Sequence, residues 1–79
     1  MATTTGKLLT QNERELCQKI AALKVVPASP RAQVLLLLDD GHTQAKSCEL
    51  SSLTLGQLRY LLRLFKQKGM NLFPDNLFP

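Results

Sequence analysis

The sequence predicts an all-α fold, a small domain of four helices followed by an irregular carboxyl-terminal tail. Two segments carry apolar residues at intervals of three and four positions, which is the spacing of a helix that buries one face. Two segments also open with Thr-x-x-Glu or Thr-x-x-Gln, the pattern of an N-terminal capping box. A chain of 79 residues has room for a single hydrophobic core, and its 44% hydrophobic and 20% charged residues are typical of a globular domain.

The first helix is expected at residues 11–24. Thr10 and Glu13 can form the capping box, in which each side chain accepts from the backbone N–H of the other residue. The helix should end before Pro27, because the residue preceding a proline avoids the helical conformation. Residues 1–9 are mostly small and polar and predict a flexible arm. The apolar stripe of the helix consists of Leu16, Ile20 and Leu23.

The second helix is expected to begin at Ser29–Pro30, with the Ser29 hydroxyl as N-cap and a proline at the first helical position. Residues 32–38 are almost continuously apolar, so most of the helix surface should be buried. A buried strand is the alternative for Val34–Leu38, but the leucine content and the flanking helix caps favour a helix. Gly41 can end this helix in the left-handed conformation.

A third, short helix is expected from Thr43, which can cap it, to about Ser51. Ala45 and Cys48 place small residues on one of its faces, which allows a neighbouring helix to approach closely. Residues 51–53 then form a turn.

The last helix begins with the second capping box, formed by Thr54 and Gln57, and ends at Gly69. Its polar and charged residues fall on the faces that the apolar stripe leaves free. The expected buried stripe is Leu58, Leu61, Leu62 and Phe65.

The tail repeats Asn-Leu-Phe-Pro, at residues 71–74 and 76–79. Its prolines and its Asn and Asp residues argue against regular structure. We expect Phe73 to pack on the last helix and Phe78 to be free. The predicted organisation is an arm at 1–9, a helical domain at 10–70 and a tail at 71–79.

The positive charge of the chain is concentrated near its carboxyl end. The net charge is +4, and residues 54–69 contain four cations and no acid, whereas the other six cations are balanced by six acids. A concentrated positive potential attracts polyanions such as nucleic acid. The alternative is a solvated cationic helix end that complements the helix dipole. The four cations are Arg59, Arg63, Lys66 and Lys68.

Several classes of protein and site are not expected. No apolar run is long enough for a transmembrane helix, and the first residues lack a signal-peptide pattern, so we expect a soluble cytoplasmic chain without membrane contacts. Cys17 and Cys48 are distant in sequence, and we expect reduced thiols rather than a disulfide. A zinc site needs closely spaced Cys and His, and His42 is the single histidine. No metal or cofactor is expected.

Catalysis is also not expected. Asp39 and Asp40 stand near His42, but neighbouring helical residues point about 100° apart, so we interpret the two carboxylates as solvated groups at a helix end. His42 follows a helix-ending glycine and should cap or face solvent. The sequence has neither a Gly-rich phosphate loop nor a nucleophile elbow. We expect no enzyme activity and no small-molecule substrate.

Two short helices joined by a tight turn, the second of them basic, are typical of the helix-turn-helix arrangement. The first helix must cross the second closely, and Cys48 is the expected small contact residue. Leu53 should point inward from the turn and pack against Leu58 and Leu61. The second helix would then project its first turn and one outer face into a DNA major groove.

Two segments, Arg31–Gly41 and Glu49–Tyr60, resemble the second helix and the following helix-turn-helix of the N-terminal DNA-binding domain in mariner-type insertion-sequence transposases, a homeodomain-like fold. The resemblance covers roughly residues 9–74. Such motifs usually have Ala where Cys48 stands and Gly where Ser52 stands. If the turn requires a positive φ, a serine there costs on the order of 1 kcal/mol.

The resemblance implies which residues meet DNA. Residues near the bases would include Gln57, able to pair with adenine, and Arg59, able to pair with guanine, while Gly56 would let the backbone approach the duplex. Gln57 can instead serve only the capping box, and Tyr60 can instead cover the edge of the core. The implied base-proximal residues are Thr54, Leu55, Gln57 and Arg59, with Tyr60 and Arg63 next to them. The implied phosphate contacts are Lys46, Lys66 and Lys68.

The sequence thus predicts a protein that binds double-stranded DNA, either a transcription regulator or the detached DNA-binding domain of a transposase-like protein. One module of this size reaches few base pairs, so sequence-specific binding implies a homodimer or tandem sites. The alternative is a helical protein–protein interaction module that does not bind DNA, using the basic helix and the Phe-rich tail to hold its partner.

Overall fold

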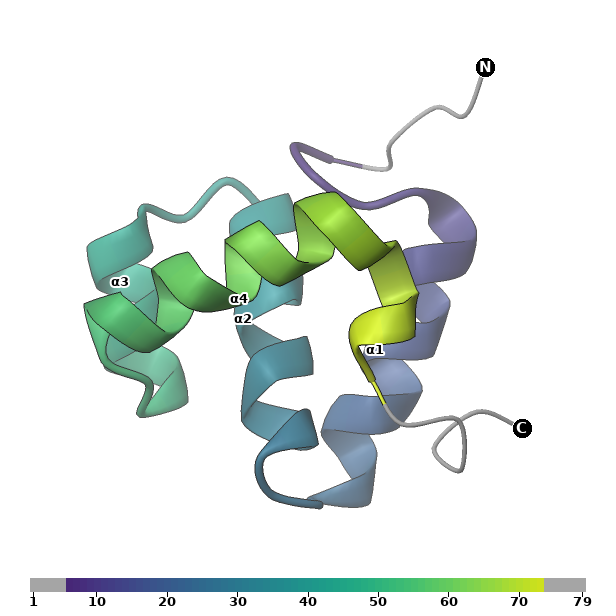
Figure 1. The fold of residues 1–79 in the computed structure, drawn as a ribbon, viewed down its shortest axis with the longest axis horizontal. Coiled ribbons are helices and arrows are strands. Elements are labelled where there is room, and N and C mark those ends of the chain that lie inside the picture. The colour runs from purple at the N-terminus through teal and green to yellow at the C-terminus, as the bar shows by residue number, and fades with distance from the viewer. Residues whose placement is uncertain (1–5, 74–79) are drawn as a thin grey trace.

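Four α-helices and one short 3-10 helix make up the described part of the chain, residues 6–73 of a computed structural model (Figure 1). No strand occurs within these residues, so the predicted all-α fold of four helices is confirmed. The elements in order are α1 (Gln11–Leu23), α2 (Ala28–Asp39), α3 (Gln44–Ser51), α4 (Leu55–Lys68) and the 3-10 helix η1 (Gly69–Leu72).

The helices surround α2. Helices α1 and α2 lie side by side in opposite directions, and α3 and α4 also pack on α2, with α4 crossing in front of it in Figure 1. After α4, η1 turns the chain back toward α1, where Cys17 Sγ lies 3.9 Å from Met70 Sδ. The buried apolar core is Leu9, Cys17, Ile20, Ala28, Ala32, Val34, Leu35, Leu58, Leu61 and Phe73.

The expected caps of three helices are confirmed. At α1 the Thr10 hydroxyl accepts from Glu13 N–H (3.2 Å), and the Glu13 carboxylate accepts from Thr10 N–H (2.9 Å). At α3 the Thr43 hydroxyl accepts from the N–H of Lys46. Helix α4 carries the second capping box. These bonds satisfy amide groups that a helix cannot pair internally.

Helix α2 begins two residues earlier than expected, with Ala28 in place of Pro30 as its first residue, and Ser29 is not its N-cap. The Ser29 hydroxyl accepts from Val25 N–H and donates to the carbonyl of Ile20, both at 2.7 Å. It therefore joins the end of α1 and the connection after it to the start of α2. The predicted end is confirmed: Gly41 has φ 95°, and its N–H donates to Leu38.

Residues 6–9 are fixed on the core, which differs from the expected arm. Leu9 is completely buried, and the N–H groups of Leu8 and Leu9 donate to Asp39 Oδ1 at 2.9 and 2.7 Å. Lys7 N–H donates to the Asp39 carbonyl. The prediction of a flexible arm is therefore wrong for these residues. Residues 1–5, the rest of the predicted arm, lie outside the described range.

The interpretation of Asp39 and Asp40 as solvated carboxylates is wrong for Asp39, whereas Asp40 is exposed. Asp39 is buried, and Arg14 of α1 donates to its Oδ2 at 2.6 Å and to Asp40 Oδ1 at 2.8 Å. The forked guanidinium reaches both neighbouring carboxylates although they point in different directions. The hydrogen bond from Arg14 to Asp39, strengthened by the bond to Asp40, raises the pKa of the guanidinium above its usual value.

The beginning of the predicted irregular tail is ordered. Asn71 and Leu72 belong to η1, and Phe73 is buried in the core, with its N–H donating to the Met70 carbonyl. The 3-10 turn forms because Gly69, at φ 59°, lets the chain leave α4 and fold back. Residues 74–79, including the predicted free Phe78, lie outside the described range.

Candidate nucleic-acid interface

A three-residue connection joins α3 to α4. Ser52 stands in the left-handed conformation at φ 68° and ψ 10°, and its N–H donates to the Cys48 carbonyl at 3.0 Å. The turn therefore requires the positive φ that its sequence position suggested. Leu53 is half-buried and packs against the core, while Thr54 caps α4. The chain thus reverses tightly between the two helices.

The small residues that face the neighbouring helices differ from those expected. Ser47 is completely buried and Ser51 nearly so, whereas Cys48 is half-buried and Ala45 is exposed. The Ser51 hydroxyl donates to the Ser47 carbonyl at 2.6 Å, which satisfies it inside the interface. The most deeply buried small residues of α3 are therefore Ser47 and Ser51, four residues apart; the expected Cys48 also packs against the core, whereas Ala45 does not.

Helix α4 is anchored along one side. Leu58 and Leu61 are buried, and Leu62 and Phe65 are half-buried, which agrees with the predicted stripe. This side packs against the core of the other helices. The remaining surface of α4 therefore faces solvent.

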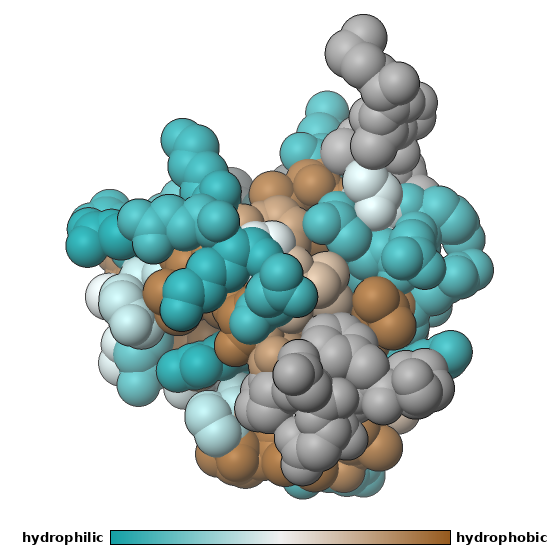
Figure 2. Space-filling model, turned by 45° about the vertical axis from the view of Figure 1, so that its right-hand side comes forward, coloured by the Kyte–Doolittle hydropathy of each residue, from teal (hydrophilic) through white to brown (hydrophobic). Residues whose placement is uncertain are grey.

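Three of the four cations of α4 share one side of the helix. At about 100° per residue, Arg59, Arg63 and Lys66 fall within roughly 60° of one another around the axis, and we call them the cationic face. Lys68 falls on the opposite side from Arg59. All four residues are exposed, and within residues 6–73 none of their side chains has an ion-pair or hydrogen-bond partner. Figure 2 shows hydrophilic side chains over the part of the surface where α4 lies.

The first turn of α4 is exposed, but two of its side chains already have partners. The Thr54 hydroxyl accepts from Gln57 N–H (3.1 Å), and Gln57 Oε1 accepts from Thr54 N–H (2.9 Å). While the cap persists, Gln57 therefore has its amide NH₂ and one remaining lone pair of Oε1 to offer. The apolar side chain of Leu55 is 41% exposed and takes no part in the cap. The nearest atom to a Cβ added at Gly56 is 4.0 Å away, so the fold does not require glycine there.

Tyr60 and Lys46 stand in different surroundings from the cationic face. Tyr60 is 53% exposed, and with Gln57 and Arg31 it lines a cleft of about 80 Å³. Lys46 on α3 is exposed, with Nζ 3.7 Å from Glu49, which partly neutralises it. Arg31 is the residue that sequence reasoning missed. Its place in the first turn of α2 gave no sign that the fold would bring it beside α4.

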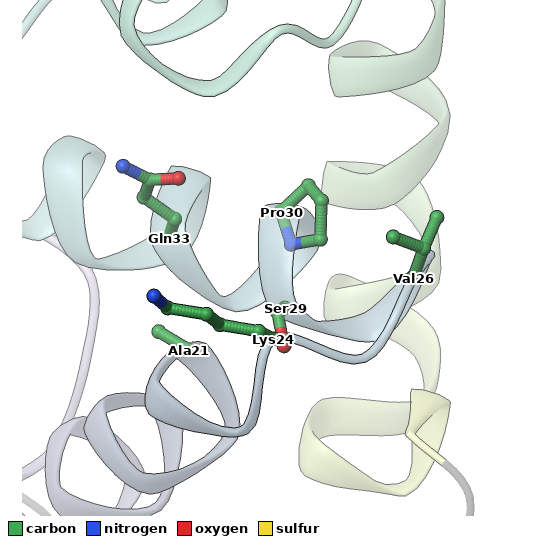
Figure 3. Close-up of a pocket in the computed structure, with 6 residues that line it drawn as sticks. All are labelled: Ala21, Lys24, Val26, Ser29, Pro30 and Gln33. Carbon is green, nitrogen blue, oxygen red and sulfur yellow. The ribbon is translucent and has the colours of Figure 1, made fainter.

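A second hollow lies between the end of α1 and the start of α2. Its volume is about 450 Å³, and in Figure 3 Lys24 extends along it toward Gln33, while Val26 points away. The Ser29 hydroxyl in its wall is already hydrogen-bonded in both directions. The hollow thus offers no buried unpaired group to hold a ligand.

The thiols and His42 show no arrangement for chemistry. Both cysteines are free, and burial, together with the nearby Glu13 carboxylate, raises the pKa of the Cys17 thiol to about 12. His42 is exposed, as one of its two predicted roles requires. Among residues 6–73, no three His, Cys, Asp or Glu side chains gather as a metal ion would need. Each helix in this range falls short of the combined length and apolar character that crossing a bilayer requires.

No protein-family model matches the chain, and no curated protein or solved structure shows significant similarity to it. The function must therefore be inferred from the geometry of α3, its turn and α4.

Proposed function

We propose that the chain is a helix-turn-helix domain that binds double-stranded DNA, with α4 lying in the major groove. The observation that carries the proposal is the cationic face: Arg59, Arg63 and Lys66 project to solvent from one side of a helix whose opposite side is anchored by Leu58 and Leu61. A duplex presents a dense row of phosphates on either side of a groove wide enough for a helix.

The charge around α4 supports the same proposal. No acidic residue occurs between Leu50 and Phe73, so the positive potential of α4 is not offset along the chain. The tight turn at Ser52 lets α3 support the start of α4 without covering it. The segments Arg31–Gly41 and Glu49–Tyr60 resemble the DNA-binding domain of mariner-type transposases, and this resemblance is compatible with α4 as the helix that meets DNA.

The exposed residues suggest how bases would be read. Arg59 lies one turn into α4 and can donate two hydrogen bonds to guanine, and Leu55 can contact a thymine methyl. Gln57 is a weaker candidate, because pairing with adenine needs the Oε1 that the cap uses. We assign Gln57 mainly to the cap. Whether the domain acts as a transcription regulator or as part of a transposase-like protein, specific binding calls for a homodimer or tandem sites.

The test is a titration with random-sequence duplex DNA at 50 to 200 mM salt, followed by fluorescence anisotropy. Binding should weaken steeply with salt. On random-sequence DNA, where no guanine stands at a fixed place, Arg59 and Arg63 each neutralise about one phosphate. Replacing both by Ala should reduce the affinity roughly 60-fold at 0.1 M salt, since each neutralised phosphate is worth about 0.9 in the slope of log K against log salt. The matched control is Lys19→Ala with Lys24→Asn, which removes one charge from α1 and one from its C-cap. Equal losses in both double variants would reject α4 as the binding element.

The second candidate is a protein–protein interaction module, and exposed apolar side chains favour it. Leu23, Val25 and Val26 are 51%, 43% and 80% exposed at the connection of α1 and α2. This corner lies at the lower edge of Figure 1, where Figure 2 also shows hydrophobic surface. Phe73 cannot contribute to such a surface, because it is buried. Absence of duplex binding at 50 mM salt would favour this candidate.

A further inference from the structure

The narrow cleft beside α4 has the size and the donors of a site for one anionic group. It lies between the start of α2 and the first turns of α4, and its volume is about 80 Å³, far below that of a typical ligand pocket. Arg31, Gln57 and Tyr60 bring a guanidinium, an amide and a phenol to it. Its other walls are Pro27 and Leu53.

The guanidinium of Arg31 is the strongest donor of this cleft, and it has no hydrogen-bond or ion-pair partner within residues 6–73. It is half-buried, yet no described carboxylate or carbonyl accepts from its side chain. None of its nitrogens is among the buried atoms that lack a hydrogen bond, so the guanidinium reaches solvent. A partly desolvated guanidinium binds phosphate more strongly than a fully exposed one does, because its charge is less screened.

The cleft and the cationic face lie on different flanks of α4. Around the helix axis, Arg59 and Lys66 point to one flank, and Gln57 points about 160° away from Arg59, on the flank where Arg31 stands. A helix in a major groove has a phosphate strand on each flank. On the second flank the first half of α4 has no cation of its own. Arg31 of α2 provides the positive charge on this flank.

We infer that Arg31, with Tyr60 and the amide of Gln57, forms a second phosphate-binding point, which holds the DNA strand opposite to the one that meets the cationic face. This inference rests on the proposed function and deepens it. Arg31 provides the charge, and the Tyr60 hydroxyl donates to the same phosphodiester. The duplex is then held from both sides of α4, by two different helices.

The experiment measures the affinity of the full chain for a random 20-base-pair duplex between 50 and 200 mM salt. Arg31→Gln should lower the slope of log K against log salt by about 0.9 and the affinity by about eightfold at 0.1 M salt, as expected for one lost phosphate contact. Arg31→Lys should keep most of the slope, because the charge remains. Lys19→Gln removes the same charge from α1 and should change the slope much less.

The outcomes separate this inference from the proposed function. If the wild-type chain binds DNA but Arg31→Gln changes the slope no more than Lys19→Gln does, the second phosphate point is rejected and the role of α4 stands. If the wild-type chain does not bind DNA, both fail. Should Arg31→Gln not fold, the side-chain N–H resonance of Arg31 in the wild-type chain decides: it must shift on adding duplex, and an unmoved resonance overturns the inference.

Discussion

Arg14 on α1 and Asp39 at the end of α2 form an ion pair in which the carboxylate is buried and the guanidinium half-buried, with Nη1 2.6 Å from Oδ2, although 25 positions separate them in sequence. The other carboxylate oxygen of Asp39 accepts from Leu8 and Leu9. One buried carboxylate therefore joins the first helix, the second helix and the segment that precedes both. Removing it should affect all three together.

Replacing Asp39 by Ala should destabilise the domain by about 3 kcal/mol, because it leaves two N–H groups without an acceptor and leaves Arg14 with the exposed Asp40 carboxylate alone. Asp40→Ala is the matched control on the same guanidinium. Its carboxylate is 46% exposed, and its loss should cost less than about 1 kcal/mol. Urea unfolding followed by circular dichroism measures both. Equal effects of the two substitutions would contradict a central role for Asp39.

Replacing Ser52 by Gly should stabilise the domain by about 0.5 to 1 kcal/mol. Ser52 holds φ 68°, which glycine adopts without strain, and part of the gain is lost to the greater freedom of glycine in the unfolded chain. Ser52→Val should destabilise, since branched side chains avoid this conformation. The melting temperatures of the two variants should move in opposite directions, and a shift in the same direction would refute the strain at this turn.

Stability should decrease above pH 9 because of Cys17. Its pKa rises from 9.0 to about 12 in the folded chain, so between these values the unfolded state loses a proton that the folded state keeps. The free energy of unfolding then falls by up to about 1.4 kcal/mol per pH unit. Cys17→Ala should remove this component. Unfolding curves at pH 8 to 11 compare the two slopes, and parallel slopes would contradict the prediction.

Gln57→Glu separates capping from DNA contact. A carboxylate at this position can still accept from Thr54 N–H and favours the helix N-terminus, so stability should be retained or rise by a few tenths of a kcal/mol. DNA affinity should fall about tenfold or more, because the new carboxylate would stand beside the phosphodiester that the Gln57 amide contacts in the inferred site, and such a like-charge pair costs on the order of 1 kcal/mol or more near a protein surface.

Thr54→Ala provides the opposite control for this prediction. It loses the hydroxyl half of the cap, at a cost of about 1 kcal/mol in stability, without changing the charge near the duplex. Calorimetry and anisotropy together report both properties. If Gln57→Glu binds DNA as tightly as the wild-type chain, the first turn of α4 does not lie near phosphates.

Local signals in the sequence predicted local structure. The capping boxes at Thr10 and Thr54, the cap at Thr43 and the left-handed Gly41 all involve partners within five positions, so a short pattern contains the whole interaction. The exposure of Arg59 and Arg63 also followed from helix periodicity. These are the parts of the fold and of the candidate site that could be predicted.

The features that were missed depend on contacts between distant segments. Ser29 binds the carbonyl of Ile20, and Asp39 binds residues 30 and 31 positions away, so neither partner is visible in a local window. Arg31 meets Tyr60 only because α2 and α4 cross. Ser47 is buried more deeply than Cys48 because of the way α3 is rotated about its axis. Periodicity does not determine this rotation when most residues of the helix are small or polar.

The anchoring of Leu8 and Leu9 has a consequence for where the domain can be cut. A truncated protein starting at Thr10, where the helical pattern begins, would keep every α-helix but would empty the site of Leu9 and strip Asp39 of two donors. The minimal cooperative folding unit must therefore extend upstream of the first helix, at least to Leu8.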